Sequence, residues 1–148
     1  MRVDVRTDVV IARPREVVAA YAADPDRAPA WYQNITSVEW KTPLPLAVGS
    51  RIAFVAQFLG RPLAYTYEVV EWRPNERFVM RTADGPFPME TTYVWEDAGR
   101  EATRMTLRNT GAPRGFSLWV APLLGIAMRR ANRKDLAALK ARLESSPQ

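Results

Sequence analysis

Three tyrosines, Tyr65, Tyr67 and Tyr93, carry the hydroxyl groups best suited to do chemistry in this sequence. Tyr65 and Tyr67 are two positions apart in a stretch typical of a β-strand, so both side chains point to one face of a sheet. We expect this to be the inner face, and the alternative is that Thr66, Val70 and Trp72 point inward instead. A tyrosine hydroxyl can hydrogen-bond a ligand carbonyl, and it can act as an acid when its pKa is shifted. The alternative is that the three rings pack in a core while their hydroxyls reach water or backbone.

Four further side chains have two interpretations each. Trp31 and Tyr32 follow a short predicted helix, where each ring either contacts a ligand or fills the core beneath the helix. Asn132 places an amide in an apolar helical stripe, where it orients a ligand or satisfies a backbone group. Alternation puts Arg81 on the outer face of its strand, and a β-bulge would be needed to turn it inward toward a carbonyl or carboxylate.

The chain has no histidine and no cysteine, which restricts its chemistry. Histidine is the usual acid and base near neutral pH, and the two residues together supply most transition-metal ligands. Any catalysis must therefore use carboxylates, tyrosine, lysine, arginine or water, with pKa values changed by burial. We expect no metal ion, no cofactor and no disulfide.

Turn residues divide the chain into elements that must position these side chains. The strand predicted over residues 3–11 alternates apolar and polar positions, and Pro14 and Asp24-Pro25 mark the starts of short helices over 15–23 and 25–30. Glycines, prolines and acidic turns then separate strands over 35–42, 51–59, 63–73, 77–83, 87–96 and 102–109. Turns at such short intervals favour an antiparallel meander over βαβ units.

Alternation along three of the strands assigns their two faces. The outer face should be wet, with Glu90, Glu96, Arg104 and Arg108 able to pair across strands. The inner, apolar face comprises Ile52, Phe54, Ala56, Phe58, Phe87, Met89, Thr91, Tyr93, Trp95, Thr103, Met105, Leu107 and Asn109.

The pattern of residues 116–143 predicts one long helix, which is apolar on nearly every side up to residue 128 and amphipathic beyond it. The stripe that we expect to face the sheet contains Ala121 and Gly125 near its start and leucines near its end. These small residues either allow close helix–sheet packing or form the wall of a cavity. If there is a cavity, we expect a ligand to contact Trp31, Tyr32, Phe54, Tyr65, Tyr67, Phe87, Met89, Met105, Gly125, Met128 and Asn132.

A second apolar stripe on the same helix, Trp119, Leu123 and Ile126, needs burial of its own. If it stays exposed, it forms an apolar patch of the kind that marks a partner or the mouth of a ligand site. Burial under the loop at residues 43–48, or in a homodimer, is the plainer expectation.

Length and charge limit the classes of partner. The 148 residues fit a single domain over 1–148, and the net charge of +5 is spread along the chain without a recognised nucleic-acid motif. We therefore expect a solvated basic helix face and no nucleic-acid partner. The apolar run at 116–128 is too short to span a membrane, which takes about 20 residues. The N-terminus lacks the apolar core of a signal peptide, so we expect no transmembrane segment and a cytoplasmic location.

Five stretches, in this order and spacing, carry a resemblance to a known family: IARPREV at 11–17, DP at 24–25 leading to PAW at 29–31, VGS at 48–50, YEVVE at 67–71 followed by Pro74 and RF at 77–78, and TRMT at 103–106. Together they resemble the START-like (SRPBCC) superfamily, in its bacterial polyketide cyclase/dehydrase and lipid-transport branch. The resemblance implies an α+β helix-grip fold, with a curved seven-stranded antiparallel sheet wrapped around a long C-terminal helix across a deep hydrophobic pocket. It carries over the location of the pocket and no catalytic residue.

Two functions follow from this interpretation, because fold does not choose between them. In the first, the protein binds a small hydrophobic molecule, such as a lipid, a polyketide or an aromatic compound, between the sheet and the long helix. In the second, it is an aromatase/cyclase-like enzyme in which tyrosine or arginine groups stabilise an enolate. The enzyme requires two or more polar groups that converge inside the cavity.

Overall fold

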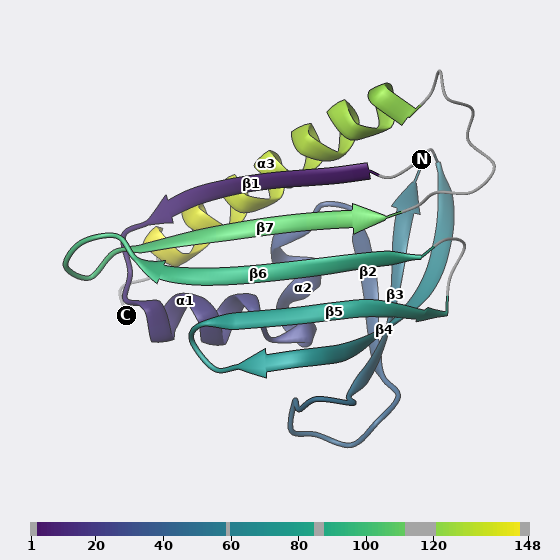
Figure 1. The fold of residues 1–148 in the computed structure, drawn as a ribbon, viewed down its shortest axis with the longest axis horizontal. Helices are drawn as coiled ribbons and strands as arrows, with labels where there is room; N and C mark the ends of the chain where they lie inside the picture. The colour runs from purple at the N-terminus through teal and green to yellow at the C-terminus, as the bar shows by residue number, and fades with distance from the viewer. Residues whose placement is uncertain (1–2, 59, 85–87, 112–120, 146–148) are drawn as a thin grey trace.

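Seven strands form one antiparallel sheet in the computed structural model, which describes residues 3–58, 60–84, 88–111 and 121–145. The strands are β1 (Val3–Ile11), β2 (Ile35–Trp40), β3 (Arg51–Phe58), β4 (Arg61–Arg73), β5 (Arg77–Asp84), β6 (Met89–Asp97) and β7 (Thr103–Gly111). They lie in the order β1-β7-β6-β5-β4-β3-β2, so the meander from β2 to β7 returns beside the first strand (Figure 1). The predicted strands are confirmed, with ends within two residues of those expected.

Two short helical segments connect the edge strands β1 and β2. Helix α1 (Arg15–Ala22) follows Pro14, and a 3₁₀ turn, η1 (Pro25–Arg27), leads directly into the single turn of α2 (Ala28–Trp31). Asp24 begins η1 because its side chain accepts a hydrogen bond from the backbone N–H of Asp26 at 3.0 Å. The second predicted helix, over 25–30, is therefore two tight turns of different kinds rather than one helix.

The long helix α3 (Ala121–Ser145) runs along the sheet behind β1 and β7 (Figure 1). Hydrogen bonds join its C-terminal end to the end of β1 and the residues that follow it. The Ala12 backbone N–H donates to Glu144 Oε2, and Lys140 Nζ donates to the Val10 carbonyl, both at 2.8 Å. The predicted helix over 116–143 is confirmed from Ala121 onward, and residues 116–120 lie outside the described residues.

Irregular pairing bends the sheet where β4 meets its neighbours. The register between β4 and β5 shifts at Thr66/Tyr67 and again at Val69/Glu71. Such bulges add an unpaired residue and curve the strand that carries them. The backbone N–H of Gly49 donates to the Val69 carbonyl at 2.8 Å. Gly49 has a φ of +95°, a backbone conformation that residues with a side chain disfavour. The result is the curved sheet of a helix-grip fold.

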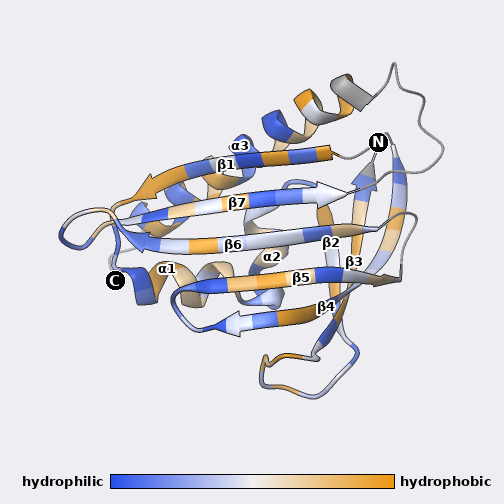
Figure 2. Ribbon diagram, viewed as in Figure 1, coloured by the Kyte–Doolittle hydropathy of each residue, from blue (hydrophilic) through white to orange (hydrophobic). Residues whose placement is uncertain are grey.

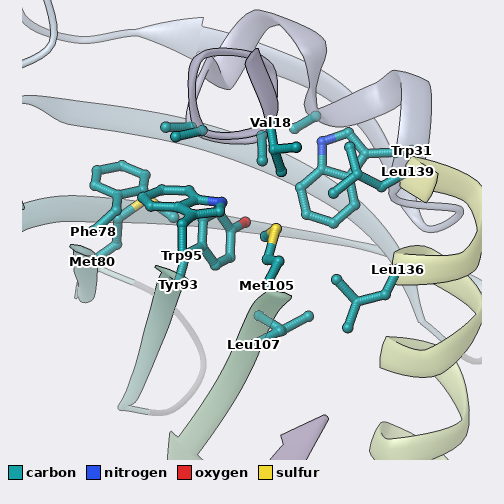
Figure 3. Close-up of a cluster of buried hydrophobic side chains, with 14 of the residues drawn as sticks. Val18, Trp31, Phe78, Met80, Tyr93, Trp95, Met105, Leu107, Leu136 and Leu139 are labelled. Atoms are coloured by element: carbon teal, nitrogen blue, oxygen red, sulfur yellow. The ribbon is translucent and has the colours of Figure 1, made fainter. Parts of the chain in front are cut away.

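The inner face of the sheet and α3 share one apolar core (Figure 3). Leu136, Leu139 and Leu143 on α3 are fully or almost fully buried, as are Trp95 and Met105 on the sheet. Each such side chain stabilises the fold by roughly 1.5–3 kcal/mol. Figure 2 shows the alternation of apolar and polar residues along β1 that directs one side of the strand to this core.

The outer face carries ion pairs between neighbouring strands. They join Arg81 to Glu90, Arg104 to Asp8 and Arg108 to Asp4, with N–O distances of 3.2, 3.0 and 2.7 Å. The side chains are largely solvent-exposed, so each pair stabilises the fold little. The predicted pairing across strands therefore occurs, but the two arginines of β7 use aspartates of β1. Two short residues of this face, Thr92 and Thr106, are buried rather than wet because they lie in central strands.

Candidate functional site

A cavity of about 370 Å³ lies between the inner face of the sheet, α2 and the N-terminal half of α3. Pockets that hold small molecules typically measure about 300–1,000 Å³. On the helix side, the cavity is bordered by the short side chains of Ala127 and Ala131. Carbon atoms dominate the wall, with contributions from Phe54, Leu63, Phe78, Met80, Leu124 and Met128.

Aromatic rings support one another along β3 and β4. The Phe54 and Tyr65 rings stack with centroids 5.8 Å apart, and the edge of Tyr65 meets Tyr67 at 5.3 Å. Offset and edge-to-face contacts of this kind fix the orientation of each ring. Both tyrosines therefore face inward, as predicted, and both lie on the cavity wall.

A chain of hydrogen bonds crosses the sheet beneath the cavity. Thr91 Oγ1 donates to Asn109 Oδ1 at 2.6 Å, and Thr91 Oγ1 is 3.1 Å from the Tyr67 hydroxyl. Because the threonine has one proton and donates it to Asn109, the Tyr67 hydroxyl is the donor to Thr91. Burial raises the pKa of Tyr67. Tyr67 is therefore a neutral donor committed to the sheet.

A second pair of hydroxyls closes the cavity near the end of α2. The Tyr32 and Tyr93 hydroxyls are hydrogen-bonded to each other although one follows α2 and the other is on β6. Burial, followed by the proximity of Tyr93, raises the pKa of Tyr32, and burial also raises the pKa of Tyr93. Both hydroxyls are neutral at physiological pH, and because one of them donates its only proton to the other, the pair has one proton left to donate to a ligand.

Asp135 is a carboxylate on the α3 side of the cavity. Its side chain is only 4% exposed, and its Oδ1 accepts a hydrogen bond from the backbone N–H of Gln33 at 3.1 Å. Burial raises the pKa of Asp135 to about 6, and the Gln33 hydrogen bond partly opposes that rise. A group with this pKa holds a proton in mild acid and releases it near neutral pH.

Asn132 lies one helical turn before Asp135 and also lines the cavity. The residue is 6% exposed, and its Nδ2 has no hydrogen-bond partner among the described residues. A buried amide donor without an acceptor costs free energy, on the order of 1–3 kcal/mol. The predicted alternative, in which Asn132 satisfies a nearby backbone group, is therefore not observed for its N–H₂ group.

The structure brings most of the expected site residues together. Those on the cavity wall are Tyr32, Phe54, Tyr65, Tyr67, Met89, Met128 and Asn132. Trp31 and Met105 are fully buried in the core next to the cavity and are not on its wall, so the core interpretation of Trp31 applies. Phe87 lies outside the described residues.

Gly125 is on α3 but not on the cavity wall, and neither of its two predicted roles is observed. A Cβ atom built at Gly125 would meet nothing within 4 Å, so the helix does not pack closely on the sheet there. The neighbouring Leu124 and Met128 line the cavity instead. Arg81 is on the outer face in its ion pair with Glu90, so the bulge that would turn it inward does not occur.

Sequence reasoning missed Asp135, the one carboxylate within the long-helix segment 116–143. The signal was present, because Asp135 is three residues after Asn132 and next to Leu136 in the stripe that faces the sheet. Thr91 and Asn109 were placed on the inner face, but their hydrogen-bonded chain could not be read from alternation alone.

The second apolar stripe of the helix is exposed where the structure describes it. Leu123 and Ile126 are 65% and 64% exposed, and Trp119 lies outside the described residues. The loop expected to cover them does not, since its own Leu44 and Val48 are exposed as well. Burial under this loop is therefore wrong, and the homodimer stays a prediction.

The described part of the chain has neither a metal-binding cluster nor a membrane-spanning helix. Within residues 3–58, 60–84, 88–111 and 121–145, no cluster of acidic, histidine or cysteine side chains is suited to hold a metal ion. No described helix combines the length and the apolar character that crossing a membrane demands.

A family model described as polyketide cyclase/dehydrase and lipid transport matches residues 2–144. No curated protein matches the sequence significantly.

Solved structures share the fold at low sequence identity. A protein of Thermus thermophilus has a TM-score of 0.83 and 23% identity, over 98% of this chain and 99% of its own. The Zhui aromatase/cyclase of Streptomyces sp. R1128 has a TM-score of 0.80 and 17% identity, over 97% and 94%. A START superfamily protein of Mycobacterium smegmatis has a TM-score of 0.83 and 14% identity, over 96% and 97%.

Proposed function

We propose, on the premise that this chain belongs to the polyketide cyclase/dehydrase and lipid-transport family, that it binds a small hydrophobic molecule in the cavity between the sheet and α3. The family match over residues 2–144 also confirms the START-like resemblance. Fold does not decide between holding a ligand and transforming it.

The single observation that carries the proposal is a cavity of about 370 Å³ with a mainly apolar wall and a few polar groups. Removing an apolar molecule from water into such a space is favourable, by about 25 cal/mol for each Å² buried. The polar groups on the wall include the Tyr32–Tyr93 pair, the Tyr67–Thr91–Asn109 chain and the Asn132–Asp135 turn. A few placed polar groups in an apolar wall are typical of small-molecule sites, because they orient the ligand.

Native mass spectrometry of the purified protein, followed by a thermal-shift screen of lipids and polyketide-like aromatics, tests this function. A ligand at a hundred times its dissociation constant should raise the melting temperature by about 5–10 °C. Ala131→Phe fills the cavity from the helix side and should abolish that shift. Ala137→Phe adds the same ring at an exposed position of α3 and should keep it. An equal response from Ala131→Phe and the unmodified protein would contradict binding in this cavity.

A second candidate function, an aromatase/cyclase, is favoured by the convergence of Asp135 with the Tyr32–Tyr93 pair on one cavity. One of the similar folds, from Streptomyces sp. R1128, is named an aromatase/cyclase. The Asp135 carboxylate would take a proton from the carbon between two ketones, and a tyrosine hydroxyl would hydrogen-bond the enolate oxygen. The enolate carbon would then attack a more distant ketone, whose oxygen would receive the proton from Asp135.

The enzyme is tested by incubating the protein with a short poly-β-ketone thioester and following the cyclic product by chromatography. Asp135→Asn should lower the rate by roughly 10²–10⁴-fold while ligand binding persists, because a general base contributes about that much. If the thioester cyclises no faster with the unmodified protein than without it, the aromatase/cyclase function is contradicted and the binding function still stands.

A further inference from the structure

The charged groups that the described residues place on the cavity wall are all of one sign. Among the described residues that line it, none is a lysine or an arginine, and the two carboxylates are Asp24 and Asp135. Asp24 is already committed, since it caps η1 through the Asp26 N–H and forms an ion pair with Arg27 at 3.5 Å. Asp135 is therefore the charge that a bound molecule meets.

Asp135 and Asn132 offer a ligand one acceptor and one donor. Oδ1 of Asp135 accepts from Gln33, and its other oxygen has no donor among the described residues. Nδ2 of Asn132 is buried without an acceptor among those same residues. Residues three apart on a helix have Cβ atoms about 5–6 Å apart, so a single ligand group can reach both. A hydroxyl fits this arrangement, because it donates to the carboxylate and accepts from the amide.

We infer that the cavity selects hydrophobic molecules whose buried end is a neutral hydroxyl, such as a phenol, and excludes those that end in a carboxylate. This inference rests on the proposed binding function and specifies its ligand class. A ligand carboxylate beside Asp135 would place two negative charges in an apolar enclosure whose described wall residues include no cation to offset them. A ketone or an ether would satisfy Asn132 but leave the second carboxylate oxygen of Asp135 without a donor.

The ionisation state of Asp135 agrees with this discrimination. Burial raises its pKa only to about 6, so the carboxylate is largely charged at neutral pH. The nearby hydroxyls of Tyr32 and Tyr93 are neutral, since burial raises the pKa of each, and therefore cannot compensate a second anion.

Isothermal titration calorimetry with 2-naphthol and 2-naphthoate tests the inference on the unmodified protein. The two probes share one ring system, and at about pH 7.5 only the second is an anion. We expect 2-naphthol to bind roughly tenfold or more tightly than 2-naphthoate, the ratio that corresponds to about 1.4 kcal/mol. Equal affinities would overturn the inference and leave the binding function in place. Absence of binding by both probes would count against both.

Variants separate the role of Asp135 from the general charge of the protein. Asp135→Asn keeps the shape of the side chain and removes its charge, so 2-naphthoate should gain affinity severalfold while 2-naphthol loses some. Glu96→Gln removes one negative charge from the exposed outer face and should leave the ratio unchanged. Asn132→Leu should lower the affinity for 2-naphthol about fivefold, because it removes the amide donor of Asn132. An unchanged ratio in Asp135→Asn, with folding verified by circular dichroism, would overturn the inference.

Discussion

Thr91 is the middle member of the hydrogen-bonded chain that links Tyr67 to Asn109 across three strands. Replacing Thr91 with Val keeps the shape of the side chain but leaves the buried Tyr67 hydroxyl without its acceptor and Asn109 Oδ1 without its donor. We expect Thr91→Val to lower the free energy of unfolding by about 1–3 kcal/mol, as measured by urea denaturation.

The neighbouring Thr92 provides a matched control for this change. Thr91 and Thr92 are 5% and 8% exposed, but they point to opposite faces of β6, and Thr92 has no side-chain hydrogen bond to another described residue. Thr92→Val should therefore change the free energy of unfolding by less than about 0.5 kcal/mol. Equal effects of the two substitutions would show that the hydrogen-bonded chain does not stabilise the inner face.

Asp135 should make the stability of the fold depend on pH. Burial raises its pKa to about 6 in the folded protein, whereas a free aspartate has a pKa of about 3.9. The folded state therefore binds the proton more tightly than the unfolded state. The stabilisation is complete below about pH 4 and is lost as the pH rises through about 6.

This dependence is measured as the difference between the unmodified protein and Asp135→Asn, because other carboxylates cancel in that difference. Urea denaturation at several pH values from about 4 to 7 should show the unmodified protein losing on the order of 2 kcal/mol relative to the variant. A constant difference over this range would mean that Asp135 titrates as a solvated carboxylate.

At the scale of elements, the two ends of α3 have different roles. The C-terminal half fills the core with Leu136, Leu139 and Leu143, whereas the N-terminal half borders the cavity and exposes Leu123. We expect Leu139→Ala to lower the free energy of unfolding by about 2–5 kcal/mol, because it leaves a void in a packed core.

Leu123→Ala, on the same helix and with the same change of side chain, is the control. Because Leu123 is 65% exposed, its truncation should cost less than about 0.5 kcal/mol. Thermal denaturation of both variants measures the contrast. A large loss from Leu123→Ala would indicate that this residue is covered in solution.

At the scale of the whole molecule, the exposed Leu123 and Ile126 stay the predicted contact of a homodimer. If two copies bury this face, Leu123→Glu should convert a dimer into a monomer, since a charge would have to be desolvated at the contact. Sedimentation velocity over a range of concentrations measures the change. A monomer at the highest concentration of the unmodified protein would contradict the dimer.

The architecture of the molecule was predictable because it depends on local patterns. Alternation along residues 3–11 and in the later strands, together with proline and glycine turns, identifies seven strands. Spacing of three and four residues identifies the buried face of α3 through Leu136 and Leu139. These periods are imposed by backbone geometry, so the order of apolar residues is enough to read them.

The interior of the cavity was decided only by the tertiary structure. The sequence indicated inward-facing tyrosines and Asn132, but for a possible cavity wall on the helix it offered Gly125, whereas Ala127 and Ala131 line the observed space. The distance between the curved sheet and the helix decides which short side chains border an open space. The spacing of apolar residues along the chain contains no information about that distance. The partners of Asp135 and Tyr32 are likewise distant in the chain, so their pairing with Gln33 and Tyr93 follows from packing alone.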